Sequence, residues 1–111
     1  MINDIIGKTV KGIVDRPINS RHPSHKEMIY PINYGYIEGV FANDGDEQDV
    51  YIMGTDKPIS TFEGKVIAVY HRFNDVEDKW IVSLDGKDYS DKEILDAIYF
   101  QEQYFEGELI R

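Results

Sequence analysis

Residues 44–49 constrain this chain most, because four of the six are acidic. The segment reads Asp44-Gly45-Asp46-Glu47-Gln48-Asp49. Carboxylates this close together repel one another, so a fold that gathers them needs a compensating cation. Mg²⁺ takes oxygen ligands and usually pairs one or two carboxylates with waters and phosphate oxygens. The segment therefore favours phosphate chemistry on a metal ion, with a solvated acidic turn as the alternative.

The composition is that of one globular domain. The 111 residues are 41% hydrophobic and 13% aromatic, which suits a single domain over residues 1–111. A net charge of −9 disfavours nucleic acid and anionic membranes as partners. The N-terminal residues lack the pattern of a signal peptide, and no apolar stretch approaches membrane-spanning length. We therefore expect a cytoplasmic protein.

Hydrophobic periodicity predicts five short strands. They are expected at residues 5–15, 34–41, 48–53, 65–73 and 79–84. Between the first two, residues 17–29 are expected to form a loop, because proline, asparagine and serine recur there. With the helix that follows, these strands favour a mainly β fold, a small closed or partly open barrel with one C-terminal helix. An open sheet covered by the helix is the alternative.

The helix is predicted from its N-terminal cap. Ser90 and Glu93 fit a capping box, in which the hydroxyl and the carboxylate satisfy two backbone N–H groups. Gly107 is expected to end the helix. The stripe expected to pack on the sheet consists of Ile94, Leu95, Ile98 and Tyr99, with Glu102 at its end.

A second acidic group precedes the last predicted strand and contains Asp75, Glu77 and Asp78. Two acidic turns at the same end of a small barrel would form a two-metal site, whereas a polar hairpin tip is the alternative for this turn. Phosphate chemistry also requires cationic donors near the carboxylates. The candidates are Arg16, Arg21 and Lys79, each of which is otherwise a solvated surface charge.

The remaining aromatic and imidazole side chains are expected to be structural. Three tyrosines should fill the core or the barrel edge, namely Tyr36, Tyr70 and Tyr99. The histidines lack the cysteine or second close pair that would complete a tetrahedral zinc site. We therefore expect loop or surface positions for His22, His25 and His71.

Two segments together resemble the signature of the soluble family I inorganic pyrophosphatases. Tyr30-Pro31-Ile32-Asn33-Tyr34-Gly35-Tyr36-Ile37 is similar to the aromatic strand of that signature, and Asp44-Gly45-Asp46-Glu47-Gln48-Asp49-Val50 is similar to its acidic motif. Weaker similarity lies at Val14-Asp15-Arg16, at the acidic turn ending in Lys79, and at Gln103-Tyr104. The strong similarity covers residues 30–50, and the weaker segments extend it over most of the chain.

The resemblance implies an OB-like five-stranded β-barrel and Mg²⁺-dependent hydrolysis of diphosphate to two phosphates. Asp44, Asp46 and Asp49 would be metal ligands, with Asp49 helping to activate the attacking water and Asp46 as the candidate base. From the second turn, Asp75 and either Glu77 or Asp78 would bind further metal. Arg16, Lys79, Tyr34 and Tyr104 would bind phosphate. The family's habit of assembling suggests a homo-oligomer.

The chain also departs from the family pattern. Phe105 replaces the lysine that normally follows the C-terminal tyrosine, and residues 19–26 form an uncommon basic insertion that includes Arg21. A family glutamate and lysine from the N-terminal portion have no evident counterpart, although Lys8 or Lys11 is a candidate for the lysine. Two alternatives to an inorganic pyrophosphatase therefore stay open. One is a hydrolase of another phosphoanhydride, such as a nucleotide held by the insertion, and the other is a catalytically weakened module that binds metal or phosphate.

Overall fold

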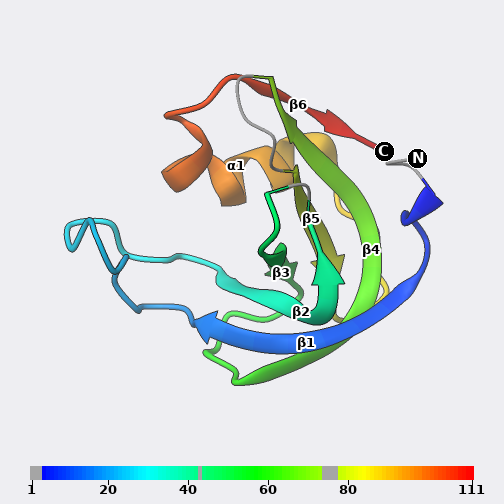
Figure 1. Cartoon of the computed structure of the whole chain (residues 1–111), viewed down its shortest axis with the longest axis horizontal. Helices are drawn as coiled ribbons and strands as arrows, with labels where there is room; N and C mark the ends of the chain where they lie inside the picture. The colour runs from blue at the N-terminus through cyan, green and yellow to red at the C-terminus, as the bar shows by residue number, and fades with distance from the viewer. Residues whose placement is uncertain (1–3, 43, 74–77) are drawn as a thin grey trace.

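The computed structural model describes residues 4–42, 44–73 and 78–111. Within these residues the chain forms six strands and one helix, shown in Figure 1. The strands are β1 (Thr9–Arg16), β2 (Asn33–Phe41), β3 (Glu47–Met53), β4 (Thr61–Arg72), β5 (Asp78–Ser83) and β6 (Gly107–Ile110). The helix is α1 (Asp91–Glu102).

Five strands close into a barrel. Their order is β1-β2-β3-β5-β4, and antiparallel pairing of β1 with β4 completes the ring. All pairs in the ring are antiparallel except β3 and β5, which run parallel. The predicted mainly β, five-stranded OB-like barrel with one helix is therefore confirmed, and the closed ring decides against an open sheet.

Alternating side chains of the strands build two hydrophobic cores. On β3, Val50 and Ile52 belong to one cluster, whereas Tyr51 and Met53 belong to another that includes Ile94 and Ile98 of the helix. This alternation follows from the two-residue period of a strand. It makes β3 buried on both faces, and it places Tyr51 on the face that α1 covers.

The helix begins at the predicted capping box, but only some of the residues predicted to face the sheet are buried. Both hydrogen bonds of the capping box between Ser90 and Glu93 are present. Ile94 and Ile98 are fully buried, as expected. The buried face continues through Gln101 and Glu102, which lie seven and eight residues after Ile94 on the same side of a helix.

Two members of the predicted stripe are instead exposed. Leu95 is 40% and Tyr99 is 63% exposed, so their assignment to the sheet-facing stripe is wrong. Each lies one position beyond a buried isoleucine, a rotation of about 100° that turns the side chain toward solvent. Tyr70 is buried, as predicted, and Tyr36 is partly buried.

The prediction that Gly107 ends the helix is also wrong. The helix ends at Glu102, and Gly107 begins β6, a sixth strand that pairs with β4. A Cβ atom at Gly107 would lie 2.4 Å from the carbonyl oxygen of His71. Glycine is therefore needed here for a close approach of two strands.

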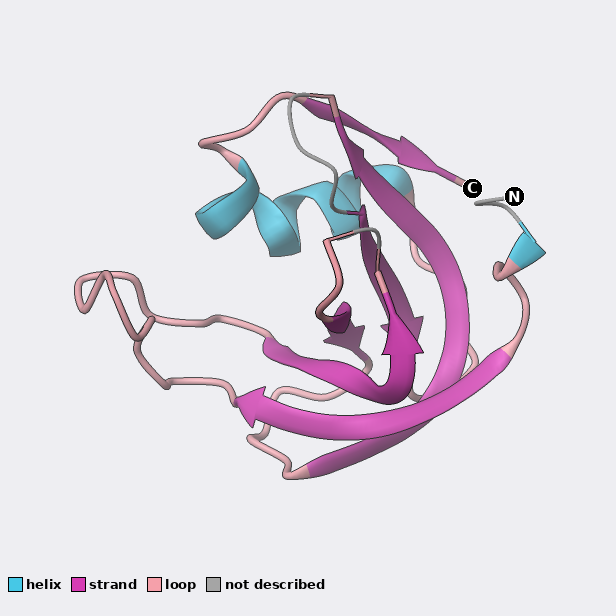
Figure 2. Cartoon of the chain, in the orientation of Figure 1, coloured by secondary structure: helices cyan, strands magenta, loops and turns pink. Residues whose placement is uncertain are grey.

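The segment between β1 and β2 is a loop, as predicted, with an isolated bridge between Arg21 and Ile29. Backbone hydrogen bonds hold its two sides together, including Tyr30 N–H to the Ser20 carbonyl at 2.9 Å and His22 N–H to the Met28 carbonyl at 2.9 Å. Figure 2 shows this loop extending beyond the barrel on the side of the C-terminal end of α1. No helix in the described part of the chain is both long and apolar enough to cross a membrane.

Candidate active site

The parallel pairing of β3 with β5 brings the two acidic turns to one end of the barrel. Val50 pairs with Trp80 and Met53 with Ser83, so both strands enter the sheet from the same end. The side chain of Gln48 connects the starts of the two strands, because its amide nitrogen donates to the carbonyl of Asp78 at 2.7 Å. The starts of the two strands therefore lie side by side, while a metal site shared by their acidic side chains stays a prediction. Asp75 and Glu77 lie outside the described residues.

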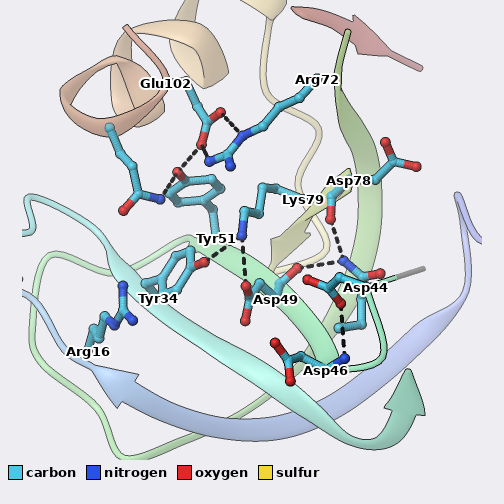
Figure 3. A network of polar contacts seen from close by, with 12 residues as sticks. Arg16, Tyr34, Asp44, Asp46, Asp49, Tyr51, Arg72, Asp78, Lys79 and Glu102 are labelled. Carbon is cyan, nitrogen blue, oxygen red and sulfur yellow. Dashed lines mark hydrogen bonds and ion pairs between the residues drawn. The ribbon is translucent and has the colours of Figure 1, made fainter. Parts of the chain in front are cut away.

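Lys79 is the central cation of this end. Its side chain is 4% exposed, and Nζ donates to Asp49 Oδ2 at 2.7 Å and to the Tyr34 hydroxyl at 2.9 Å (Figure 3). Burial, reinforced by the negative charge of Asp49, raises the pKa of Tyr34 well above its ordinary value. The Tyr34 hydroxyl therefore keeps its proton at neutral pH and can donate a hydrogen bond to an anion.

Arg16 lies at the end of β1 and supplies a second cation. One guanidinium nitrogen donates to the Tyr30 hydroxyl at 2.6 Å, and Cζ lies 5.2 Å from the centre of the Tyr34 ring. Contact with two aromatic rings holds the planar guanidinium in place, and such pre-organisation favours recognition of phosphate.

The acidic turn that precedes β3 presents oxygen donors. Gly45 adopts a φ of +88°, which suits glycine, and the Asp46 N–H donates to Asp44 Oδ1 at 3.0 Å. Figure 3 draws the Asp44, Asp46 and Asp49 side chains in one region of the view. The residues described here contain no ready-made group of three metal-ligating side chains. Mg²⁺ needs only one or two carboxylates beside waters, so the donor set of the turn still fits this ion.

A cavity of about 540 Å³ opens at this end of the molecule. It brings together five of the predicted site residues, namely Arg16, Tyr34, Asp49, Lys79 and Tyr104. Arg21 is not among its lining residues, and its guanidinium donates to the Lys26 carbonyl at 2.8 Å in an exposed position. Asp78 also lies off the cavity, with its carboxylate 2.7 Å from His71 Nδ1.

Several residues that line the cavity were not among the predicted site residues. They are His22, His25, Glu27, Met28, Arg72, Gln101 and Phe105. The histidines were identified only as surface residues, and Arg72 was not singled out. The basic insertion at residues 19–26 was the available signal for His22 and His25, since an uncommon insertion before the aromatic strand adds side chains at this end of the barrel.

Arg72 links the cavity to the helix. It is 4% exposed, and its Nε and one terminal nitrogen donate to the two carboxylate oxygens of Glu102 at 2.8 and 2.7 Å. Glu102 also accepts from the Tyr51 hydroxyl at 2.5 Å, and the guanidinium carbon lies 3.7 Å from the centre of the Phe105 ring. These contacts fix both the end of α1 and the side chains that follow it at the cavity.

Gln101 continues this network toward Arg16. Its amide nitrogen donates to the Tyr51 hydroxyl at 2.6 Å, and its amide oxygen accepts from the Tyr30 hydroxyl at 3.0 Å. Since Arg16 donates to the same Tyr30 hydroxyl, hydrogen bonds run from the helix end to the cationic floor of the cavity.

A closed OB-like barrel with a cationic cavity beside an acidic turn defines a class of proteins built for phosphate chemistry. The family model of inorganic pyrophosphatase matches residues 9–106. The chain therefore belongs to the inorganic pyrophosphatase family, whose members are hydrolases.

Solved structures support the same fold. The inorganic pyrophosphatase of Ehrlichia chaffeensis is 22% identical with a TM-score of 0.71, over 93% of this chain and 85% of that one. That of Neisseria gonorrhoeae is 22% identical with a TM-score of 0.64, over 94% and 81%. That of Thermus thermophilus is 18% identical with a TM-score of 0.63, over 94% and 76%. A comparison with curated protein sequences gave no match.

Proposed function

We propose that this chain is an Mg²⁺-dependent inorganic pyrophosphatase that hydrolyses diphosphate to two phosphates. The observation that carries the proposal is the buried Lys79, bonded to Asp49 and Tyr34 beside the acidic turn of a chain of this family. A buried cation between a carboxylate and a phenol suits a site in which anionic oxygens bind and charge develops during reaction.

The acidic turns would hold the metal. Asp44, Asp46 and Asp49 would be its ligands, joined by Asp75 and by Glu77 or Asp78 from the second turn. When bound, Mg²⁺ would polarise the phosphoryl oxygens and lower the pKa of a bound water. Asp46 would accept the proton of the attacking water, and Asp49 would orient that water.

The cationic floor would bind the substrate. Arg16 and Lys79 would pair with diphosphate oxygens and stabilise the negative charge that grows on the leaving phosphate. Tyr34 and Tyr104 would donate phenolic hydrogen bonds to the same oxygens. Arg21, which does not line the cavity, would attract the anion only over a longer distance.

Phosphate release from diphosphate, measured with and without Mg²⁺, tests this proposal. Asp49→Asn should lower the rate at least a hundredfold, because a metal ligand and the partner of Lys79 is lost. Asp96→Asn is the matched control, since this exposed helix residue pairs with Lys92 at the surface, and its rate should stay unchanged. Release that does not depend on metal, or no release at all, would contradict the proposal.

A catalytically weakened module that binds metal or phosphate is the second candidate. It is favoured by Phe105, an uncharged ring that lines the cavity where the family pattern has a lysine. Calorimetry would separate the two candidates, because binding of Mg²⁺ and diphosphate without hydrolysis would select the weakened module. A cytoplasmic location and a homo-oligomer complete the proposal.

A further inference from the structure

The mouth of the cavity differs chemically from its floor. Arg16, Lys79 and Asp49 make the floor ionic, whereas the mouth is lined mainly by rings and Met28, with one exposed carboxylate from Glu27. A volume of about 540 Å³ falls in the range of about 300–1,000 Å³ that is typical of pockets for organic ligands. Diphosphate and hydrated metal ions would bind to the ionic floor. Their oxygen atoms do not require contact with aromatic rings, so these ligands do not explain the rings at the mouth.

Two segments that are distant in the sequence form the mouth. His22, His25 and Met28 come from the loop between β1 and β2, and Tyr104 and Phe105 follow the end of α1. Figure 1 shows this loop and the C-terminal end of the helix on the same side of the molecule. The mouth is therefore a gap with imidazole rings on one side and benzene rings on the other.

The ring of His22 is held in place by its own loop. Its Nδ1 accepts from the backbone N–H groups of Ser24 at 3.0 Å and of His25 at 3.2 Å. The ring lies within 10° of parallel to the Tyr30 ring, with 6.2 Å between their centres. Because Nδ1 accepts both bonds, the imidazole is neutral and presents a fixed flat face.

On the opposite side of the mouth, two aromatic side chains are exposed to solvent. Tyr104 is 69% and Phe105 is 40% exposed, although both line the cavity. The guanidinium of Arg72, 3.7 Å from the centre of the Phe105 ring, positions that ring. Exposed rings beside a cavity are suited to stack on a flat ligand.

We propose that the cavity also takes nucleoside 5′-diphosphates, and this inference rests on the proposed function. The diphosphate group would lie on Arg16 and Lys79, with the base between His22 and the rings of Tyr104 and Phe105. Aromatic side chains can stack on any of the bases, because every base has a flat π face. Water would attack the terminal phosphorus, and the bond from that phosphorus to the bridging oxygen would break. The bridging oxygen leaves with the nucleoside monophosphate, and the proton of the water passes to Asp46 and then to solvent.

Calorimetry with two non-hydrolysable probes tests the binding part. The probes are α,β-methylene-ADP and methylenediphosphonate, which differ by the nucleoside, each titrated with Mg²⁺ present. His22→Ala should weaken α,β-methylene-ADP about tenfold more than methylenediphosphonate. Phe105→Leu keeps apolar bulk at an exposed position and should show the same selective loss. Equal losses for the two probes in both variants would overturn the inference.

Turnover of ADP and diphosphate by the unmodified protein separates this inference from the proposed function. Hydrolysis of both compounds supports the nucleotide site as well as the pyrophosphatase. Hydrolysis of diphosphate with no binding or turnover of ADP overturns the nucleotide site and leaves the pyrophosphatase intact. Hydrolysis of ADP without that of diphosphate overturns the pyrophosphatase and supports the nucleotide site. An alkyl diphosphate that binds as tightly as ADP would overturn the stacking role of the rings.

Discussion

Lys79 is an ammonium group buried with an acidic and a phenolic partner, and each partner matters for a different reason. Asp49 balances its charge at 2.7 Å, whereas Tyr34 gives a neutral oxygen at 2.9 Å and orients the amine. Burying a cation without such partners would cost several kcal/mol. The site therefore depends on Tyr34 for geometry as well as for any contact with substrate.

Replacing Tyr34 with phenylalanine tests this role. The variant keeps the buried ring but removes one acceptor of Lys79, so we expect a loss of about 1 kcal/mol in the free energy of unfolding. We expect kcat/KM for diphosphate to fall about tenfold, since the cation is less well placed. Tyr89→Phe is the control, because it removes another hydroxyl, bonded to Asp85 at the surface. Equal effects of the two substitutions on activity would contradict the role of Tyr34.

Asp15 makes the stability of the fold depend on pH, and the direction of this dependence follows from the shift of its pKa. Desolvation raises the pKa of its carboxyl, in spite of the neighbouring Arg16. The folded protein then holds the proton of Asp15 more tightly than the unfolded chain, whose pKa is about 3.9. Stability from this group is therefore present below the unfolded pKa and is lost as pH rises through the folded value.

Asp15→Asn should consequently stabilise the protein at pH 7. The gain in Tm should shrink as pH falls toward about 3.5, where the native carboxyl is also protonated. Thermal unfolding of the variant and the native protein over this range measures the difference. Asp56→Asn, at an exposed loop position, is the control substitution. If the gain in Tm instead grew as pH falls, the direction given for the pKa shift of Asp15 would be wrong.

At the scale of elements, the Arg72–Glu102 ion pair joins β4 to the last turn of α1. Both side chains are 5% exposed or less, and two hydrogen bonds connect them. Arg72→Met leaves the Glu102 carboxylate buried without this partner, which we expect to cost about 3–5 kcal/mol. Urea unfolding measures the change.

A second substitution distinguishes loss of the pair from loss of packing. Arg72→Met combined with Glu102→Leu removes both charges, and apolar replacement of a buried pair is often close to neutral. The double variant should recover at least half of the lost stability. If it unfolds as easily as Arg72→Met alone, the cost lies in the stem of Arg72 and its contact with Phe105 rather than in the unpaired charge.

The elements that the sequence predicted correctly carry local signals. Short apolar runs, at residues 50–53 and 80–82, mark β3 and β5, and the capping box of Ser90 and Glu93 marks the start of α1. The sixth strand has no such signal, because Gly107–Ile110 is short and its pairing with β4 depends on where the helix ends. The bounds of β1 and β4 were also missed: β1 begins at Thr9 rather than at residue 5, and β4 begins at Thr61 because residues 61–64 pair with β1.

The same distinction holds for the site. The acidic turn and Lys79 could be predicted, because their spacing around two strands is a local pattern that resembles a known family. Arg72 could not, because its place at the cavity depends on Glu102, thirty residues further along. His22 depends likewise on a loop that folds against Tyr30. Contacts between distant segments, rather than local periodicity, determine the mouth of the cavity.

Across the whole molecule, a net charge of −9 opposes folding through self-repulsion, and the acidic turn concentrates part of that charge. Any salt screens such repulsion, but only a bound ion stabilises the native state by mass action. We therefore expect Mg²⁺ to raise Tm beyond the effect of NaCl at equal ionic strength. At a hundred times its Kd, the specific part amounts to about 2.7 kcal/mol.

Thermal unfolding with Mg²⁺ and with matched NaCl separates these two contributions. Asp46→Asn should abolish the Mg²⁺-specific increment, because it removes a proposed ligand at the turn, while the NaCl response stays the same. Asp96→Asn removes the same charge from the exposed face of α1 and should retain the increment. Equal rises in the two salts for the native protein would mean that the acidic turn binds no ion specifically, so the proposed metal-assisted hydrolysis would have no metal site.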